Sequence, residues 1–149
     1  MPVNKTWIRL GSGMHLAMYR LSNGFLGGRL LGAPVLLLTA KGRKTGREHT
    51  SPLMYLEDGG SYIVIASNGG NADHPGWYKN LRKHPEAEVQ VRADRRSVRA
   101  EDVTGDERER LYARAVAVYN GYEQYQKEAS RTIPVVRLVP VQDADTEHS

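Results

Sequence analysis

PVLLLTAKGRKTGREHTSPLMYL, residues 34–56, is the stretch that decides the fold. Val35–Ala40 is a continuous apolar run, and Thr50–Leu56 is rich in β-branched, aromatic and other apolar residues, which is the composition of buried strands. Gly42 and Gly46 lie between the two runs and free the backbone to turn sharply. We therefore expect two neighbouring strands joined by a short turn.

The turn itself, Lys41–Arg47, is strongly basic, with four cations in seven residues. Arginine forks bind phosphate or carboxylate oxygens bidentately, and lysine adds a point charge. The turn is therefore a candidate anion site, although a solvated hairpin tip would have the same composition. It is not a nucleotide-binding P-loop, because Lys44 and Thr45 precede the second glycine and a strand follows.

Composition bounds the classes of function. A chain of 149 residues is large enough for one domain with its own core, and we expect a single domain over 1–149. The absence of cysteine excludes a disulfide framework and a thiolate nucleophile, and the five scattered histidines lack zinc-ligand spacing, so no metal is expected.

The net charge of +4 favours an anionic partner. No nucleic-acid motif is present, and the arginines of 92–99 are interpreted as a solvated, charge-protected strand edge.

Other elements follow from apolar periodicity and turn residues. A third strand, Tyr62–Ser67, is expected to extend the first two into a meander through the turn Asp58-Gly59-Gly60. A helix is expected from Pro75 to Lys83, capped by Asp73 or His74, and a hairpin of Glu88–Ala93 and Ser97–Val103 is expected to turn at Asp94 and Arg95. A second helix would begin at a capping box of Thr104 and Glu107, with Leu111, Ala115 and Val118 on one face. A last strand is expected at Ile133–Leu138.

The two ends of the chain carry separate expectations. A helix over Asn4–Leu21, within a terminal segment 1–25, presents an apolar stripe that suits the core, a membrane surface or a lid. A glycine-rich connection, Asn23–Gly32, follows it, and the polar tail 141–149 is expected to be mobile. With no transmembrane run or signal peptide in the sequence, we expect a cytoplasmic protein. Two points stay open: peripheral contact with the inner membrane face, and whether the protein is a monomer or a homodimer.

Two further motifs carry chemistry. Ser67-Asn68-Gly69-Gly70 follows a strand and could bring backbone amides close to a ligand, or could simply close a hairpin. Tyr119, Tyr122 and Tyr125 recur every three residues and would share one side of a continuing helical or turn-like segment, either as pocket phenols able to donate a proton or as an aromatic packing ladder. The element pattern predicts an α+β domain built on an antiparallel barrel or sheet.

Taken jointly, the motifs resemble the deazaflavin (coenzyme F-420)-dependent nitroreductase family. The resemblance rests on Gly-Arg-Lys-Thr-Gly at 42–46, the Ser-x-Gly-Gly loop at 67–70, Pro-x-Trp-Tyr at 75–78 and Arg-Thr-Ile-Pro at 131–134. It implies a split β-barrel of the flavin-binding type, with about six mostly antiparallel strands and flanking helices. It also implies a reductase that uses reduced coenzyme F-420 to transfer hydride to quinones, nitro compounds or conjugated enones.

The resemblance also implies roles for individual residues. Arg43 and Lys44 would meet the phosphate or acidic glutamyl tail of the cofactor, while Tyr122 is the best candidate for a proton donor, with Ser67, Tyr119 and Tyr125 as the other catalytic candidates. The cofactor-binding set implied is Arg43, Lys44, Thr45, Arg47, His49, Ser67, Asn68, Gly69, Gly70, Gly76, Trp77 and Asn80.

Three positions depart from the family pattern, in which some members carry Arg at His49, Lys at Asn68 and Met at Gly76. The first two changes remove cations near the cofactor, and Arg47 offsets part of this loss of charge. The third change opens space above the deazaflavin ring. Two alternatives stay open: a reductase that uses flavin mononucleotide, and a non-catalytic deazaflavin carrier or anion-binding module.

Overall fold

The computed structural model describes residues 29–30 and 33–141. The helix predicted over Asn4–Leu21, the tail after Val141 and most of the glycine-rich connection lie outside the described residues. Within that connection, Arg29–Leu30 form the short strand β1, which pairs with the start of β2. No helix in the described part of the chain is long and apolar enough to cross a membrane.

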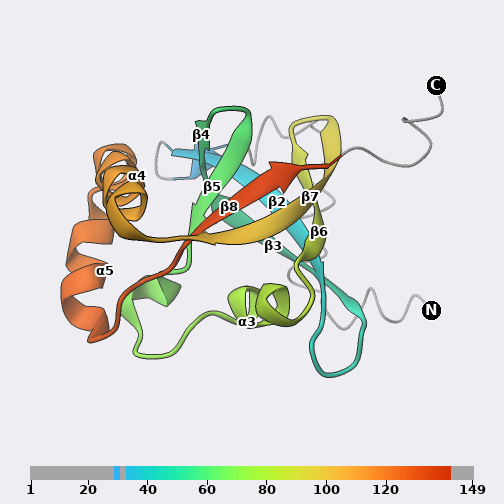
Figure 1. Ribbon diagram of the computed structural model, residues 1–149, viewed down its shortest axis with the longest axis horizontal. Coiled ribbons are helices and arrows are strands. Elements are labelled where there is room, and N and C mark those ends of the chain that lie inside the picture. The colour runs from blue at the N-terminus through green and yellow to red at the C-terminus, as the bar shows by residue number, and fades with distance from the viewer. Residues whose placement is uncertain (1–28, 31–32, 142–149) are drawn as a thin grey trace.

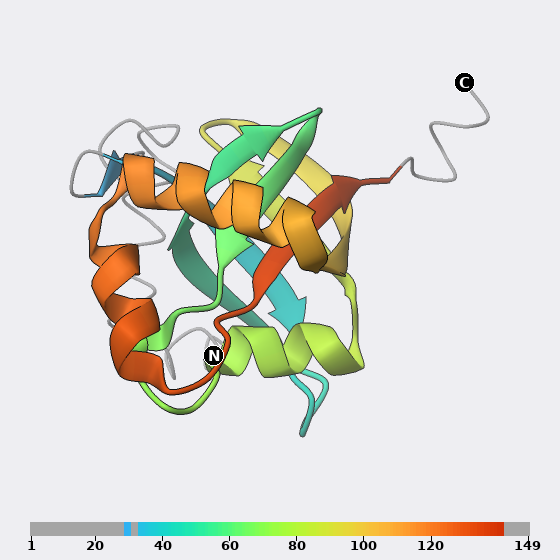
Figure 2. The same cartoon turned by 60° about the vertical axis from the view of Figure 1, so that its left-hand side comes forward.

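The described strands form one curled antiparallel sheet, visible from two directions in Figures 1 and 2. Its order is β1-β2-β6-β7-β8-β5-β4, with β3 paired to β2. No ladder joins β3 to β4 in the described residues, so the curl is a split barrel. The bounds are Arg29–Leu30 (β1), Ala33–Lys41 (β2), Glu48–Met54 (β3), Leu56–Asp58 (β4), Ser61–Ile65 (β5), Glu86–Val91 (β6), Asp94–Val103 (β7) and Val135–Pro140 (β8).

Three helices flank the sheet. Helix α3, Gly76–Lys83, lies below the barrel in Figure 1, while α4, Gly105–Val118, and α5, Gly121–Ala129, lie at its left side. A single 3-10 turn, η1, covers Asn68–Gly70 between β5 and α3. The expected α+β class and split barrel are confirmed, with eight strands where about six were predicted because β1 and β4 are very short.

Two apolar clusters explain this layering. Strand β5 is buried on both faces, and its side chains alternate between the clusters, as the two-residue period of a strand requires. Val64 packs inside the barrel with Leu36 and Leu138, whereas Ile63 packs outside it with Leu111 of α4. Each such side chain contributes about 1.5–3 kcal/mol by leaving water. The apolar runs seen in the sequence therefore pack against two layers at once.

The predicted meander is wrong. The run Thr50–Leu56 is two strands, because β3 ends at Met54 and β4 begins at Leu56. Between them the N–H of Tyr55 still donates to the Pro34 carbonyl at 3.1 Å, at the end of the ladder with β2. The next hairpin turns at Gly59 and Gly60 as expected, both with positive φ, but β5 then pairs with β8 from the far end of the chain.

The second hairpin turns earlier than predicted. Val91 pairs with Asp94, so Arg92 and Ala93 form the two-residue turn, with Arg92 at φ 56°. The interpretation of the neighbouring arginines as a strand edge holds for Arg95 and Arg96, which pair with β6 alone because the ladder with β8 begins at Val98. It is wrong for Arg99, which lies between β6 and β8.

The helix starts were placed correctly but their caps were not. Pro75 is itself the N-cap of α3, and neither Asp73 nor His74 caps it. Thr104 is the N-cap of α4 without a side-chain hydrogen bond, because the Glu107 carboxylate instead accepts from Arg137 at 2.5 Å. Leu111 and Ala115 are buried on α4 as predicted, but Val118 is 42% exposed near the end of that helix.

Candidate active site

The basic turn between β2 and β3 projects beyond the sheet next to α3 (Figure 1). The Gly42 N–H donates to the Arg47 carbonyl at 2.7 Å, and the Gly46 N–H donates to the Gly42 carbonyl at 2.9 Å. Gly46 has φ 78°, and a Cβ at Gly42 would lie 2.8 Å from the His49 Nε2 atom. Both glycines are therefore required, one for the left-handed backbone and one for a close approach.

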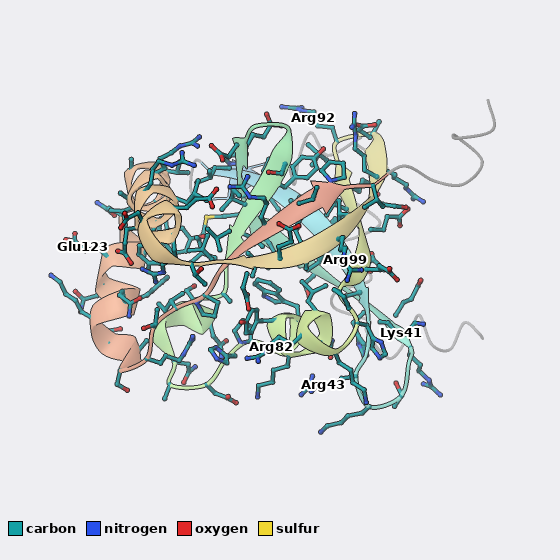
Figure 3. The ribbon with its side chains drawn as sticks, viewed as in Figure 1. Lys41, Arg43, Arg82, Arg92, Arg99 and Glu123 are labelled. Atoms are coloured by element: carbon teal, nitrogen blue, oxygen red, sulfur yellow. The ribbon has the colours of Figure 1, made fainter. Side chains whose placement is uncertain are left out.

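Arg43 is held in place by α3. The buried Asn80 side chain accepts from the Arg43 backbone N–H at 3.1 Å and from its guanidinium at 2.8 Å. The Lys83 ammonium in turn donates to the Arg43 carbonyl at 3.3 Å. Figure 3 shows Arg43 at this end of the molecule. The fold thus orients one cation of the turn rigidly.

The turn is electrostatically unpaired. No carboxylate of the described residues lies within ion-pair distance of Lys41, Arg43, Lys44 or Arg47, whereas arginines 108, 110, 114 and 137 all have acidic partners. Lys44 and Arg47 are also exposed. Unpaired cations gathered at one end of a molecule attract anions. The anion-site interpretation of the turn is thus the better supported of the two.

Arg43, Lys44 and Arg47 line the first half of an open groove of about 640 Å³. Thr45, His49, Gly76, Trp77 and Asn80 line it with them, so most of the predicted cofactor residues meet here. Nothing lies within 4 Å of a Cβ placed at Gly76, which leaves that wall open. Asn80 is at the wall, but its carbonyl oxygen is already used by Arg43.

The groove continues into a second recess of about 380 Å³, because Ser51 and Trp77 line both. Of the other predicted residues, this recess is lined by Ser67, Asn68, Gly69, Tyr122 and Tyr125, whereas Gly70 and Tyr119 do not line it. Its remaining walls are largely apolar and come from β3, β5 and the start of α3: Pro52, Leu53, Met54, Ile65 and Pro75. A basic end and an apolar, phenol-lined end are therefore joined in one groove.

The loop Ser67–Gly70 reaches the recess through unusual backbone geometry. Asn68, Gly69 and Gly70 all have positive φ, at 50°, 63° and 85°. Gly70 packs directly on α5, since a Cβ there would lie 3.2 Å from the Cα of Tyr125. The loop therefore closes against the helix that carries two of the tyrosines, and Gly70 acts behind the recess without lining it.

The three tyrosines cluster, and a break between two helices lies within the segment that carries them. Tyr119 is the C-cap that ends α4, and Tyr122 and Tyr125 belong to α5. Their ring centroids lie 5.3–6.1 Å apart, which is typical of edge-to-face aromatic packing. Tyr119 lies over Gly121, where a Cβ would be 2.5 Å from its ring. The helix break thus keeps the rings on one side.

The three hydroxyls differ in their partners. The Tyr119 and Tyr125 hydroxyls hydrogen-bond each other at 3.1 Å. Tyr122 is 6% exposed, and no described residue hydrogen-bonds its hydroxyl. Burial raises the pKa of Tyr122 well above the usual value of 10.0, so this phenol keeps its proton at neutral pH. Tyr122 is the tyrosine that combines a position in the recess with an unengaged hydroxyl.

Two residues of the site were not assigned a role from the sequence. Arg131 contacts the carbonyls of the Ser67–Asp73 loop and the ring of His74. Burial, and next the charge of Arg131, lowers the pKa of His74 below its usual 6.5. Arg131 did appear in the sequence as part of Arg-Thr-Ile-Pro, but no local pattern relates it to a loop 60 residues earlier.

Known proteins resemble this chain over most of its length. Residues 12–140 match the family described as F420H(2)-dependent quinone reductase. An F420H(2)-dependent quinone reductase of Mycobacterium tuberculosis (strain H37Rv) is 41% identical over 131 residues, covering 84% of this chain and 87% of that protein.

Solved structures give a consistent result. An F420-H2 dependent reductase (FDR-A) is 36% identical with a TM-score of 0.66, covering 74% of this chain and 97% of that one. A structure described as a domain-swapped dimer is 32% identical with a TM-score of 0.68, covering 93% and 99%.

Proposed function

The chain belongs to the F420H(2)-dependent quinone reductase family, and on that premise we propose that it reduces quinones with reduced coenzyme F-420 at the groove between the basic turn and Tyr122. The resemblance in the sequence is confirmed for the family, the enzyme class, the fold and the dependence on F-420. Family membership also favours a deazaflavin over flavin mononucleotide, and a reductase over a passive carrier.

The observation that carries the proposal is the continuity of the groove. Its first half has unpaired cations, and its second half has apolar walls with buried phenols. A cofactor with a planar ring at one end and a phosphate and acidic tail at the other fits this distribution of charge and polarity. When bound, the reduced deazaflavin supplies the hydride.

At the basic end, we assign anion binding to Arg43, Lys44 and Arg47. Arg43 is pre-oriented by Asn80, so it loses less side-chain freedom on binding than a mobile cation would. Asn80 therefore contributes by orienting Arg43, because the side-chain oxygen of Asn80 already accepts from Arg43. Thr45 is tied to the turn, where its hydroxyl accepts from the Arg47 N–H at 3.2 Å.

At the other end, we assign Ser67, Asn68, Gly69 and Trp77 to the ring region and Tyr122 to proton donation. Reduction of a quinone to a hydroquinone adds one hydride, which carries both electrons, and one proton. Tyr122 holds its proton at neutral pH and has no competing acceptor in the described residues. Ser67, buried in the same recess, is the second donor candidate.

The recess also favours quinones as the class of substrate. Walls of Pro52, Leu53 and Met54 suit a flat apolar molecule, and a hydroxyl at the inner end suits a carbonyl oxygen. A quinone has both properties. Activated nitro compounds and conjugated enones share them in part, and we propose these as secondary acceptors.

The experiment is an absorbance assay of the purified protein with reduced F-420. Oxidation of the cofactor is followed with a quinone, a nitroaromatic or an enone, and in parallel with reduced flavin mononucleotide as the donor. We expect turnover with F-420 that is fastest with a quinone. Binding of F-420 without turnover of any acceptor would support the carrier alternative, and turnover with the flavin alone would replace the cofactor assignment.

A further inference from the structure

Arg131 lies at the end of α5 and reaches across to the loop between β5 and α3. Its Nε donates to the Asn71 carbonyl at 3.0 Å, and its terminal nitrogens contact the carbonyls of Ala66, Ser67 and Asp73 at 3.0–3.4 Å. One terminal nitrogen also lies 2.9 Å from the His74 Nδ1 atom. One side chain therefore gathers four carbonyls and one imidazole.

These contacts use the whole hydrogen-bonding capacity of the guanidinium. An arginine has five N–H donors and no acceptor, and here five different groups receive them. No donor is left over for a ligand. Arg131 is thus built into the protein in a way that Lys44 and Arg47 of the basic turn are not.

The direction of the carbonyls determines the direction of the N–H groups. In a trans peptide the C=O and the following N–H point to opposite sides, and no cis peptide occurs in the described residues. Because the Ala66 and Ser67 carbonyls face Arg131, the N–H groups of Ser67 and Asn68 face away from it. Neither N–H has a partner among the described residues, and both residues line the recess.

We propose that Arg131 is a positioning residue, which holds the Ser67–Gly70 loop so that the N–H groups of Ser67 and Asn68 act as a donor pair for an acceptor atom of the bound ring. The inference rests on the proposed function, because it names the groove as the ring site. Arg131 acts through the loop and does not touch the ligand. Two oriented backbone donors that need no reorganisation are an efficient way to fix a ring in place.

His74 completes the arrangement. Its Nδ1 accepts from Arg131, so its proton lies on Nε2, and its ring packs on Tyr78 of α3 with centroids 4.9 Å apart. Next to it, Asp73 pairs with Lys79 of α3 at 2.8 Å. The loop is thus tied to α3 at the same point where Arg131 ties it to α5.

The backbone of Arg131 is also fixed in position. Ser130, at φ 50°, ends α5 and turns the chain. The Gln126 side chain then donates to the Arg131 carbonyl at 2.6 Å. Gln126 is one turn from Tyr122 on the same helix, so Arg131 sets the position of the loop relative to the proposed proton donor.

The test compares Arg131→Gln and Arg131→Lys with Arg95→Gln. Arg95 is exposed on β7 with no side-chain partner in the described residues, so it controls for the loss of one positive charge. Dissociation constants are measured for reduced F-420 and for the deazaflavin riboside, a ring fragment without phosphate or tail. Melting temperature and binding stoichiometry are measured alongside.

We expect Arg131→Gln to weaken binding of the coenzyme and of the ring fragment by a similar factor of about tenfold or more, because the two backbone hydrogen bonds to the ring would be lost together. Arg131→Lys should recover part of this loss, and Arg95→Gln should bind like the unaltered protein. Unchanged dissociation constants with full stoichiometry would overturn the inference. A fall in stoichiometry at constant affinity would also overturn it, because that result indicates a purely structural role.

A second pair of variants keeps the inference testable if Arg131→Gln does not fold. His74→Asn preserves an acceptor near the Nδ1 position, and His74→Leu removes it. We expect weaker ring-fragment binding for His74→Leu alone, and equal binding by both variants would contradict the inference. Failure of the unaltered protein to bind F-420 at all would count against the proposed function, which separates the two failures.

Discussion

Among single residues, Tyr122 shows how burial defines a chemical role. Its neighbours Tyr119 and Tyr125 share a hydrogen bond, while the Tyr122 hydroxyl has no such partner in the described residues. Its backbone is nevertheless fixed, because the buried Tyr112 hydroxyl donates to the Tyr122 carbonyl at 2.7 Å. A rigid, protonated and unengaged phenol in a recess has the properties of a proton donor.

Removing that hydroxyl should lower turnover more than binding. We expect Tyr122→Phe to reduce kcat by about a hundredfold, the lower end of what general acids contribute, with a smaller change in KM. Tyr62→Phe is the matched control, because Tyr62 is a buried tyrosine of β5 that does not line the groove. Steady-state kinetics with a quinone measures the effect. Equal activity of both variants would move the role to Ser67.

His74 should make stability depend on pH. Its pKa is lowered in the folded protein, first by burial and then by Arg131, with smaller lowering effects of Arg82 and Lys79 opposed by Asp73. Below the usual value of 6.5 the unfolded chain therefore binds more protons than the folded one, so stability is lost as the pH falls.

The matching variant is His74→Asn, which cannot titrate in this range. We expect the melting temperature of the unaltered protein to fall between pH 7 and pH 5 by more than that of the variant, because the unfolded chain takes up a proton there that the folded His74 resists. The comparison is made by thermal unfolding in matched buffers. Parallel curves would show that His74 is not the titrating group.

Among the elements, the β2–β3 turn depends on α3 for its shape. Three cations of the turn are exposed, but Arg43 is fixed by Asn80, one turn before the end of the helix. The turn and the helix thus form one wall of the groove although they are more than 30 residues apart. The hairpin supplies the charge, and the helix supplies its orientation.

Removing the charge should weaken binding of the coenzyme selectively. We expect Arg43→Ala with Lys44→Ala to raise the dissociation constant of F-420 by about tenfold or more, as lost charge-assisted contacts do, while binding of the ring fragment stays the same. Arg95→Ala with Lys127→Ala makes the same change in net charge on exposed residues outside the groove. Fluorescence titration gives both constants. Equal effects of the two double variants would reject the assignment of the turn.

Across the whole molecule, one acidic residue links three elements far from the groove. Asp58, at the β4–β5 turn, accepts from Arg110 at 3.3 Å and Arg114 at 2.8 Å on α4 and from Arg137 at 3.1 Å on β8. The pKa of Asp58 is lowered, mainly by its hydrogen bond to Arg110, with Arg137 adding to the effect against partial desolvation. This network holds α4 against the open end of the split barrel.

We expect Asp58→Asn to lower the melting temperature at neutral pH while leaving kcat and KM unchanged below the unfolding range. Because the folded pKa lies below the usual 3.8, the contribution of Asp58 is present above that value and lost as the pH falls through the folded pKa. The difference between variant and unaltered protein should therefore shrink in acid. Glu86→Gln, which breaks an exposed pair with Arg99, is the control. A variant with altered kcat would show that the network reaches the groove.

Much of the fold was predictable because its strands are apolar on both faces. Val35–Ala40 and Tyr62–Ile65 could only be buried strands, and the Gly59-Gly60 turn could only be a tight hairpin. The partners of these strands were not predictable. Whether β5 continues to β3 or crosses to β8 depends on how the sheet curls, and the local pattern is the same in both cases.

For the active site, the sequence by itself determined the chemistry available: a basic turn, a glycine loop and three phenols, together with the family motifs that relate them. Such features are local, since residue type and spacing decide charge, backbone freedom and proton affinity. Only the tertiary structure decided which groups cooperate. Asn80 orients Arg43, Arg131 directs the N–H groups of a loop 60 residues away, and burial keeps the Tyr122 proton in place, because each effect depends on distance in space and exclusion of water.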